Sequence, residues 1–211
     1  MEDVLRLYAR PYDRLRPVVC LDEKPVVLHS SKRRGRAASM GRVGRIDYEY
    51  RRHGTANAYC IIEPLTGRRL THATARRGYQ EFAQALARIA RRYRRAKTIH
   101  LVIDNLGIHC EEACIKTYGP LHGPALWRRF TVHYTPKHGS WLNAAEMEVS
   151  LLSRQCLGSR RISSLSELKY DVDVWSREAD RQRRPIQWKF RVKDARRTFR
   201  YGGITTPRSE D

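Results

Sequence analysis

The sequence predicts an α/β fold in which helices flank a mixed sheet. Residues 98–104 form a nearly all-apolar run, as expected for a central strand that is covered on both faces. Other strand-like segments precede and follow a strongly amphipathic helical segment, which is typical of this fold class. With 211 residues the chain is long enough for one domain with a core, which we expect to span residues 1–200 and to end in a disordered tail at 201–211.

Apolar runs bounded by turn residues mark the strands of the first half. Residues 17–22 and 26–29 predict two short strands, because Lys24 and Pro25 mark a break between them. Residues 32–45 form a Gly/Arg-rich loop that either follows a phosphate backbone or is only solvated. Further strands are expected at 46–52, 57–65 and 68–74, with a turn at Thr66 and Gly67.

Helical periodicity becomes clear after these strands. Apolar residues spaced by three and four predict a helix over 78–95, whose arginine-rich face is either turned to DNA or simply solvated. After it we expect strands at 98–104 and 130–134, a helix at 110–117, a loop at 119–123, and a helix at 141–156 with Ser140 as its N-cap.

The last third of the chain carries two further local signals. Ser164 and Glu167 form a capping box ahead of an amphipathic helix. Ile186, Trp188 and Phe190 alternate with polar residues, which predicts an edge strand or an extended arm.

The charge of the chain indicates its partner. There are 42 Lys and Arg residues against 22 Asp and Glu, which gives a formal net charge of +20. Such an excess favours nucleic acid, and an anionic membrane fits less well because no basic amphipathic helix has a bulky apolar face. No apolar stretch approaches the ~20 residues that span a bilayer, and the N-terminus lacks a secretory pattern, so we expect a cytoplasmic protein.

The cysteines do not predict a metal site. Their number, five, is odd and fits a reducing compartment better than a disulfide framework. His109 and Cys110, followed by Cys114, invite a zinc interpretation. No second pair of ligands has a matching spacing, so zinc is disfavoured.

Acidic residues in three local contexts form the candidate site. Asp22 and Asp104 each end an apolar run, and glutamates lie inside the helix predicted at 141–156. Such carboxylates can hold hard divalent cations, and on a strongly basic chain the expected substrate is a phosphodiester. Helix geometry does not choose between Glu146 and Glu148, which flank the buried stripe at similar angles. The plain alternative is that these carboxylates are surface or salt-bridged groups.

The neighbours of the two aspartates also carry alternatives. Asn105 either orients a ligand or phosphate or closes the strand in an Asx turn. His109 either contacts DNA or the leaving group, or is a histidine at a helix start. Glu23 follows Asp22, and adjacent residues on a strand point to opposite faces, so only one of the two can join a given site.

Four segments of the sequence occur in a recognisable order. They are Val18–Lys24 (VVCLDEK), Tyr48–Thr55 (YEYRRHGT), Leu101–His109 (LVIDNLGIH) and His133–Glu146 (HYTPKHGSWLNAAE). Together they closely resemble the catalytic domain of bacterial insertion-sequence transposases of the mariner-like superfamily, also called DDE superfamily endonucleases. The resemblance extends over about residues 4–200, and its last segment is the most specific.

The resemblance implies a ribonuclease-H-like fold with two magnesium ions, for which manganese can substitute. It assigns Asp22, Asp104 and Glu146 as the catalytic and metal-binding residues, and the spacing after Ser-Trp-Leu-Asn selects Glu146 over Glu148. The expected supporting residues are Asn105, His109 and Asn143. The expected DNA-binding residues are Arg33, Arg34, Arg36, Arg42, Lys137 and His138.

The activity that the resemblance implies is cleavage of DNA strands at insertion-sequence ends, followed by attack of the 3′-hydroxyl on target DNA. We expect double-stranded DNA as the partner, a homodimer as the assembly, and a location with the bacterial nucleoid. Relatives usually carry an N-terminal helix-turn-helix region, and Asp22 comes too early for one, so we expect a catalytic domain alone, as in a truncated copy. Two alternatives are an inactive DNA-binding remnant and a ribonuclease-H-like nuclease with another substrate.

Overall fold

The computed structural model describes residues 1–33, 35–45 and 48–201 of the chain. Three stretches lie outside the described residues: Arg34, the first two residues of the strand expected at 46–52, and the tail beyond Tyr201. The elements follow in the order α1 (Glu2–Tyr8), β1 (Val18–Ser31), β2 (Tyr50–Glu63), β3 (Arg68–Thr74), α2 (Tyr79–Arg92), β4 (Ile99–Ile103), α3 (Glu111–Trp127), β5 (Phe130–Tyr134), the 3₁₀ turn η1 (Ser140–Leu142), α4 (Ala145–Leu151), the π-helical turn η2 (Leu152–Leu157), α5 (Leu165–Gln182) and α6 (Val192–Phe199).

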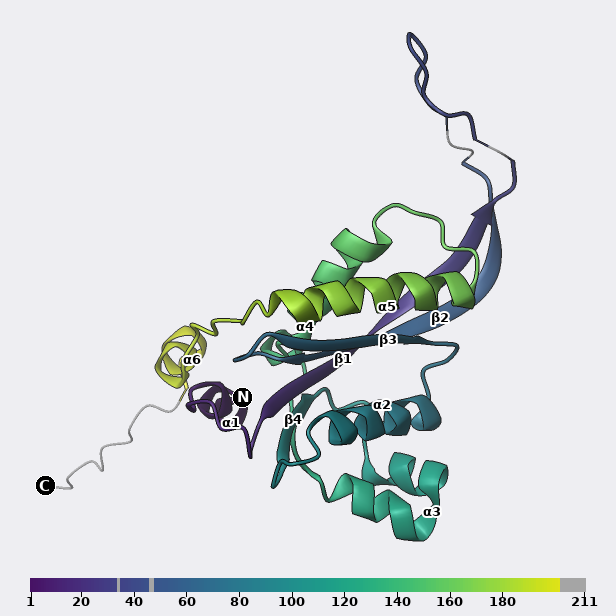
Figure 1. The fold of residues 1–211 in the computed structure, drawn as a ribbon. Helices are drawn as coiled ribbons and strands as arrows, with labels where there is room; N and C mark the ends of the chain where they lie inside the picture. Colours follow the sequence, from purple (N-terminus) through teal and green to yellow (C-terminus); the bar gives the residue numbers. More distant parts are fainter. Residues whose placement is uncertain (34, 46–47, 202–211) are drawn as a thin grey trace, which may run out of the picture.

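The described strands form one mixed sheet in the order β3-β2-β1-β4-β5. β1 pairs antiparallel with β2 and β2 with β3, whereas β4 lies parallel to both β1 and β5. Helices α2 and α3 lie on one side of the sheet, and α4 and α5 lie on the other, as Figure 1 shows. The predicted α/β fold with a mixed sheet flanked by helices is therefore confirmed.

Side-chain alternation along β1 divides the core between the two faces of the sheet. Val19 and Leu21 pack in the cluster that includes α2 and α3. Val18 and Cys20 pack on the other face, in the cluster that includes Leu142. All residues of β4 are buried, as predicted for a central strand with helices on both sides.

Two predicted strand breaks are wrong. β1 runs through Pro25 without interruption, because β4 borders β1 only as far as Cys20 and the proline lies on the open edge beyond it. β2 is one strand where separate strands were expected at 46–52 and 57–65.

The segment between β1 and β2 is more regular than the loop predicted at 32–45. Its two sides are joined by isolated bridges between Arg36 and Arg45 and between Ser39 and Arg42. The segment projects from the body beyond the ends of β1 and β2 (Figure 1). We call residues 32–45 the arm.

The predicted helices are also corrected in two places. α3 spans Glu111–Trp127 but is kinked at Gly119, whose backbone is non-helical (φ 81°), so that a second helical segment follows where the loop at 119–123 was expected. The single helix expected at 141–156 is divided, because Asn143 is extended and α4 begins only at Ala145. Ser140 therefore does not cap it. Instead, Asn143 Oδ1 accepts a hydrogen bond from the Ala145 N–H (3.1 Å).

The later local predictions fare better. Ser164 caps α5, since its hydroxyl accepts from the Glu167 N–H (3.2 Å), although the Glu167 carboxylate reaches the N–H of Ser163 rather than of Ser164. Residues 186–190 form an extended segment rather than an edge strand, and their apolar side chains pack on the core. Within the described residues, no helix has the length and apolar character needed to cross a membrane.

Candidate metal centre at the strand ends

Asp22 and Asp104 occupy corresponding positions on two neighbouring parallel strands. The last paired residues of β1 and β4 are Cys20 and Val102. Asp22 and Asp104 each come two residues later, so the register carries both aspartates to the same end of the sheet. Functional sites of α/β sheets form at this carboxyl end of parallel strands. The structure thus carries both predicted aspartates to the same end of the β1–β4 pair, although Asp22 lies inside β1, which continues to Ser31, and not at a strand end as predicted.

The start of α4, which carries Glu146, is tied to β1 by Asn143. The amide Nδ2 of Asn143 donates to the backbone oxygen of Leu21 (2.7 Å), the residue just before Asp22. The same side chain caps α4 at Ala145, and it is 2% exposed. Asn143 therefore acts on Glu146 through the backbone, by holding the helix start against the strand that carries Asp22.

A second tie comes from α1 and was not predicted from the sequence. The hydroxyl of Tyr8 donates to the backbone oxygen of Leu142 (2.8 Å) and accepts from the N–H of Ala144 (3.2 Å). Its ring is buried against Trp188, with ring centroids 4.9 Å apart. No local pattern marks Tyr8, because its partners lie more than 130 positions away in the chain.

The structure distinguishes the two glutamates of α4. Glu146 is exposed in the first turn of the helix. Glu148 is fully buried, and its Oε2 accepts a hydrogen bond from Nε of Arg69 (2.9 Å). Burial raises the pKa of Glu148, and the charge of Arg69 opposes this rise. The expectation that both glutamates flank the buried stripe is therefore wrong, because Glu148 points into the core.

The carboxylates around Asp22 act on one another. Burial is the main cause that raises the pKa of Asp22 from 3.8 to about 7, although the N–H of Glu23 donates to its Oδ1 (2.8 Å) and opposes the rise. The negative charges of Glu146, Glu23 and Asp104 raise this pKa further. Within the described part of the chain, no arginine or lysine forms an ion pair with Asp22, so the site concentrates negative charge.

His109 lies between Asp104 and Glu23. Its Nε2 is 2.8 Å from Oε1 of Glu23, and its Nδ1 is 2.6 Å from Oδ1 and 3.1 Å from the backbone oxygen of Asp104. Burial lowers the pKa of His109, but these acidic partners outweigh it and raise the pKa to about 10. His109 is 2% exposed, so it is placed to hold Asp104 and not to reach DNA.

The donor set fits a hard divalent cation. Among the described residues, the ligand atoms of Glu23, Asp104 and His109 lie within 4.8 Å of one another. His109 faces only acceptors through both ring nitrogens, so it needs both N–H groups and has no lone pair for a metal. The buried Oδ1 of Asp104 accepts no well-directed hydrogen bond. A cation near this oxygen and Asp22 would satisfy both. His109, which was predicted as a supporting residue, and Glu23, which sequence reasoning did not assign to the site, would support it.

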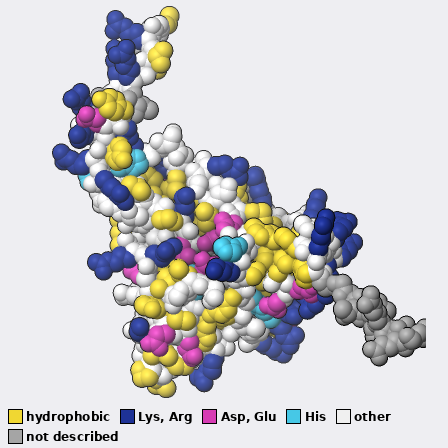
Figure 2. Space-filling view, turned by 180° about the vertical axis from the view of Figure 1, so that it is seen from behind, with side chains coloured by type: hydrophobic (Ala, Val, Ile, Leu, Met, Phe, Trp, Pro, Cys, Tyr) yellow, Lys and Arg dark blue, Asp and Glu magenta, His cyan; other side chains and the backbone are white. Residues whose placement is uncertain are grey.

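An open hollow of about 530 Å³ adjoins Asp104. Three exposed residues that were predicted to assist, Asn105, Lys137 and His138, line it together with Asp104. A tight turn shapes this wall, since a β-carbon at Gly139 would lie 2.6 Å from Cγ of Pro136. In the space-filling view of Figure 2, acidic side chains gather near the centre of the molecule with His, Lys and Arg side chains beside them.

Three further residues predicted to bind DNA lie on the arm. Arg33, Arg36 and Arg42 are exposed there, and Arg36 exchanges two backbone hydrogen bonds of 2.9 Å with Arg45. Arg34 lies outside the described residues. The arm therefore presents basic side chains on a narrow projection rather than on a shapeless loop.

Comparison with known families identifies the chain. The family model described as "DDE superfamily endonuclease" matches residues 17–169, a segment that contains Asp22, Asp104 and Glu146. This chain belongs to that family, whose members use divalent metal ions. No curated protein matches the chain.

Solved structures of Mos1 transposase share the fold. The Mos1 mariner paired-end complex with Mn is 16% identical, with a TM-score of 0.53, and the match covers 85% of this chain and 55% of that chain. The Mos1 transposase paired-end complex with the left transposon end is 17% identical, with a TM-score of 0.51, covering 86% and 56%. This chain thus spans about half the length of these proteins. The likeness confirms the ribonuclease-H-like fold.

Proposed function

We propose that residues 1–200 form a transposase catalytic domain. It cleaves DNA strands at the ends of an insertion sequence and joins the resulting 3′-hydroxyl to target DNA. The observation that supports this proposal is the register of β1 and β4, which carries Asp22 and Asp104 to the same end of this strand pair, with the charge of Glu146 acting on Asp22. Membership of the DDE superfamily endonuclease family supports it.

Asp22, Asp104 and Glu146 are the residues that would hold divalent cations, Mg²⁺ or Mn²⁺ in its place, because carboxylates are acceptor-only anionic ligands. Two such ions, when bound, activate the attacking hydroxyl and stabilise the leaving oxygen. The protein's own part is to position: His109 holds Asp104, and Asn143 holds the start of α4.

Each reaction exchanges one P–O bond for another. In cleavage, a water oxygen bonds to phosphorus, and the 3′ oxygen leaves and takes a proton to become a hydroxyl. In strand transfer, that 3′ oxygen bonds to a phosphorus of the target, and a target 3′ oxygen leaves. Lys137 and His138 line the hollow beside Asp104 and would hold a phosphate there.

The proposed partner is double-stranded DNA, both transposon ends and target, which would place the protein with the nucleoid. Arg33, Arg34, Arg36 and Arg42 are proposed to follow its phosphate backbone. The solved Mos1 complexes hold paired transposon ends, and we propose by analogy that two copies of this chain act together.

The test is nicking of supercoiled plasmid with Mg²⁺ or Mn²⁺, with EDTA as the metal-free control. We expect Asp104→Asn and Glu146→Gln each to lower the nicking rate by roughly 10²–10³-fold, the scale of removing one electrostatic group from an active site. Glu178→Gln, an exposed acid on α5, is the matched control and should nick like the wild type. Thermal unfolding with and without Mg²⁺ reports metal binding independently of activity, and Asp104→Asn should lose the stabilisation by metal.

Each other outcome has a defined meaning. Nicking by Glu146→Gln at the wild-type rate would contradict the assignment of Glu146. A folded wild-type protein that neither nicks nor gains stability from Mg²⁺ would instead be a DNA-binding remnant. Cleavage confined to a junction or an RNA–DNA hybrid would indicate a ribonuclease-H-like nuclease with another substrate.

A further inference from the structure

A basic region lies where the central strands β1 and β4 begin, at the end of the sheet opposite to the carboxylates. Two hollows of about 310 and 480 Å³ adjoin each other where β1 and β4 begin, and Tyr12 lines both. The five residues of β4 separate this end of the sheet from Asp104 by roughly 17 Å. We call the two hollows together the Tyr12 groove. Its basic residues include Arg10, Arg16 and His100 in the first hollow and Arg14, Arg94 and Arg95 in the second.

Arginines dominate the lining of the Tyr12 groove. Of the described residues that line it, seven are arginines and two, Asp13 and Glu63, are carboxylates. Within the described part of the chain, no ion pair engages Arg14, Arg94 or Arg95. Unpaired like charges in a hollow attract a polyanion, because each arginine can form strong, charge-assisted hydrogen bonds with a phosphate that neutralises it.

The second hollow gathers these arginines at the end of a helix. α2 ends at Arg92, so the negative end of its dipole lies beneath Arg94 and Arg95 and stabilises their charges. Arg92 itself is held by Asp180, which leaves the two later arginines as the cations that a ligand can engage. Arg14 faces them from the segment between α1 and β1.

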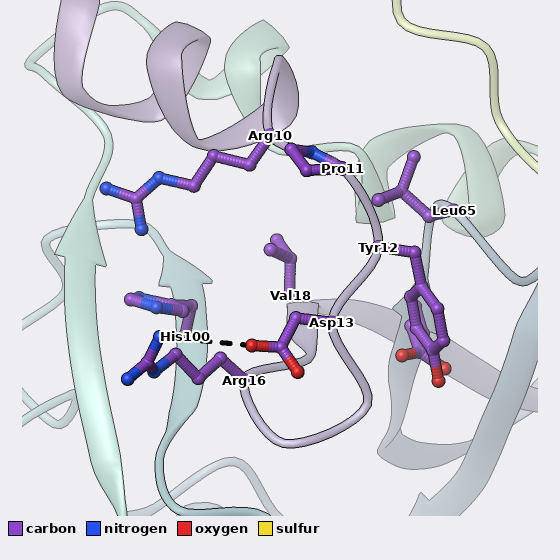
Figure 3. A pocket seen from close by; sticks show the side chains of 9 residues that line it. Arg10, Pro11, Tyr12, Asp13, Arg16, Val18, Leu65 and His100 are labelled. Carbon is purple, nitrogen blue, oxygen red and sulfur yellow. Dashed lines mark ion pairs between the residues drawn. The ribbon is translucent and has the colours of Figure 1, made fainter.

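The first hollow has a polar and an aromatic side. Figure 3 shows Arg10, Arg16 and His100 on one side, and Tyr12 with Leu65 on the other. Tyr12 is 46% exposed, so an aromatic face is open between the two sets of arginines. Base–aromatic stacking beside a basic groove is how proteins hold single-stranded nucleic acid.

His100 is fixed in this hollow by a chain of hydrogen bonds that runs through His133 to Asp3. Its Nδ1 lies 2.9 Å from Nε2 of His133, whose Nδ1 lies 2.5 Å from Oδ2 of Asp3. With His133 Nδ1–H donating to the Asp3 carboxylate, Nε2 of His133 accepts from Nδ1–H of His100, and Nε2 of His100 is left as an acceptor. Arg10 and Arg16 supply donors beside it. A nucleotide, which has phosphate acceptors and base or sugar donors, matches this mixture better than a bare anion does.

We infer that the Tyr12 groove binds a single-stranded nucleic-acid segment, with one base stacked on Tyr12 and the flanking phosphates held by the arginines of the two hollows. This site is distinct from the strand-end carboxylates and does not depend on the proposed transposase activity. It gives the protein a second nucleic-acid contact that faces away from the metal centre.

The experiment measures binding of labelled oligonucleotides by fluorescence anisotropy in EDTA, using a single strand of 12 nucleotides and the matching duplex. We expect Tyr12→Ala to weaken single-strand binding by about 5- to 100-fold and Tyr12→Phe to restore it, because the ring is what stacks. Arg14→Glu with Arg95→Glu should weaken it by at least about 10-fold. Tyr170→Ala, also an exposed tyrosine, and Arg91→Glu, an exposed arginine on α2 outside the groove, are the matched controls.

The outcomes separate the sources of the phosphate and the two sites. Displacement of the oligonucleotide by inorganic phosphate at equal concentration would show a site for free anions and overturn the inference. Equal losses in Tyr12→Ala and Tyr170→Ala would overturn it too, as would a duplex that is weakened as much as the single strand. Single-strand binding that persists in Asp104→Asn supports it, whether or not the protein nicks DNA. Circular dichroism confirms that each variant is folded.

Discussion

Two groups of acids in this protein have opposite surroundings. Glu148 and Asp180 have arginine partners: Nε of Arg69 donates to Glu148 (2.9 Å), and Nη2 of Arg92 donates to both oxygens of Asp180 (2.7 and 2.8 Å). Among the residues that the structure describes, Asp22 has no arginine partner, and it instead experiences the charges of other carboxylates. The ion pairs of the first group join β3 to α4 and α2 to α5. The acids of the second group remain available to bind a cation. Position in the sequence does not separate the two groups, since Glu146 and Glu148 are two residues apart.

The sharpest way to break this comparison is to remove the arginine of the first group. Arg69→Met leaves Glu148 buried with no cation, and we expect the free energy of unfolding to fall by about 3–5 kcal/mol. Arg69 also donates to the backbone oxygens of Gly67 and Arg184, so the turn after β2 loses its tie to the segment after α5. Urea unfolding measures the change.

The matched control is the double variant Arg69→Met with Glu148→Leu, which removes both charges. We expect it to recover much of the loss, because no buried charge is then left unpaired. A single variant as stable as the wild type would show that Glu148 is not dependent on Arg69.

A smaller effect is expected at Asp180, and it depends on pH. Burial raises the pKa of Asp180, but hydrogen bonds from Arg92 and from the N–H of Arg69 outweigh it, so the pKa is lowered from 3.8. Since the folded form holds its proton less tightly than the unfolded form, the stabilisation is complete above pH 3.8 and is lost as the pH falls further. Asp180→Asn should cost about 1 kcal/mol at pH 7.

Thermal unfolding of wild type and Asp180→Asn across acid pH checks this sign. The two stabilities should converge as the pH is lowered below 3.8. A difference that stays constant, or that grows in acid, would contradict the role given to the Arg92 pair.

The smallest expected effect sharpens the comparison from the other side. Asp22→Asn removes one of several like charges, so in EDTA the variant should be equally stable or more stable than the wild type, by less than about 1 kcal/mol. With Mg²⁺ the order should reverse, because only the wild type gains stability from bound metal. Differential scanning calorimetry in both conditions measures this. A marked loss of stability in EDTA would place Asp22 with the structural acids of the first group.

Local patterns in the sequence were enough to predict much of the fold. The apolar run that ends at Asp104 predicted β4, and the serine at 164 predicted the start of α5, because burial on both faces and capping each leave a mark within a few residues. The same patterns located Asp104 at the end of β4, but they were wrong to end a strand at Asp22, because β1 continues to Ser31. Local rules failed at Pro25, where they predicted a break, because whether a proline is tolerated depends on which strand lies beside it.

The choice between Glu146 and Glu148 shows what local sequence patterns cannot decide. Helix periodicity left Glu146 and Glu148 equivalent, and only the resemblance to transposases selected between them. The tertiary structure separates them physically, because Arg69, 79 positions earlier, lies against Glu148 and compensates its burial. Tyr8 and Glu23 were missed for the same reason: their roles arise from distant partners, Leu142 for Tyr8 and His109 for Glu23. The sequence by itself determined which residues could serve as ligands, and long-range packing decided which of them remain available to a metal ion.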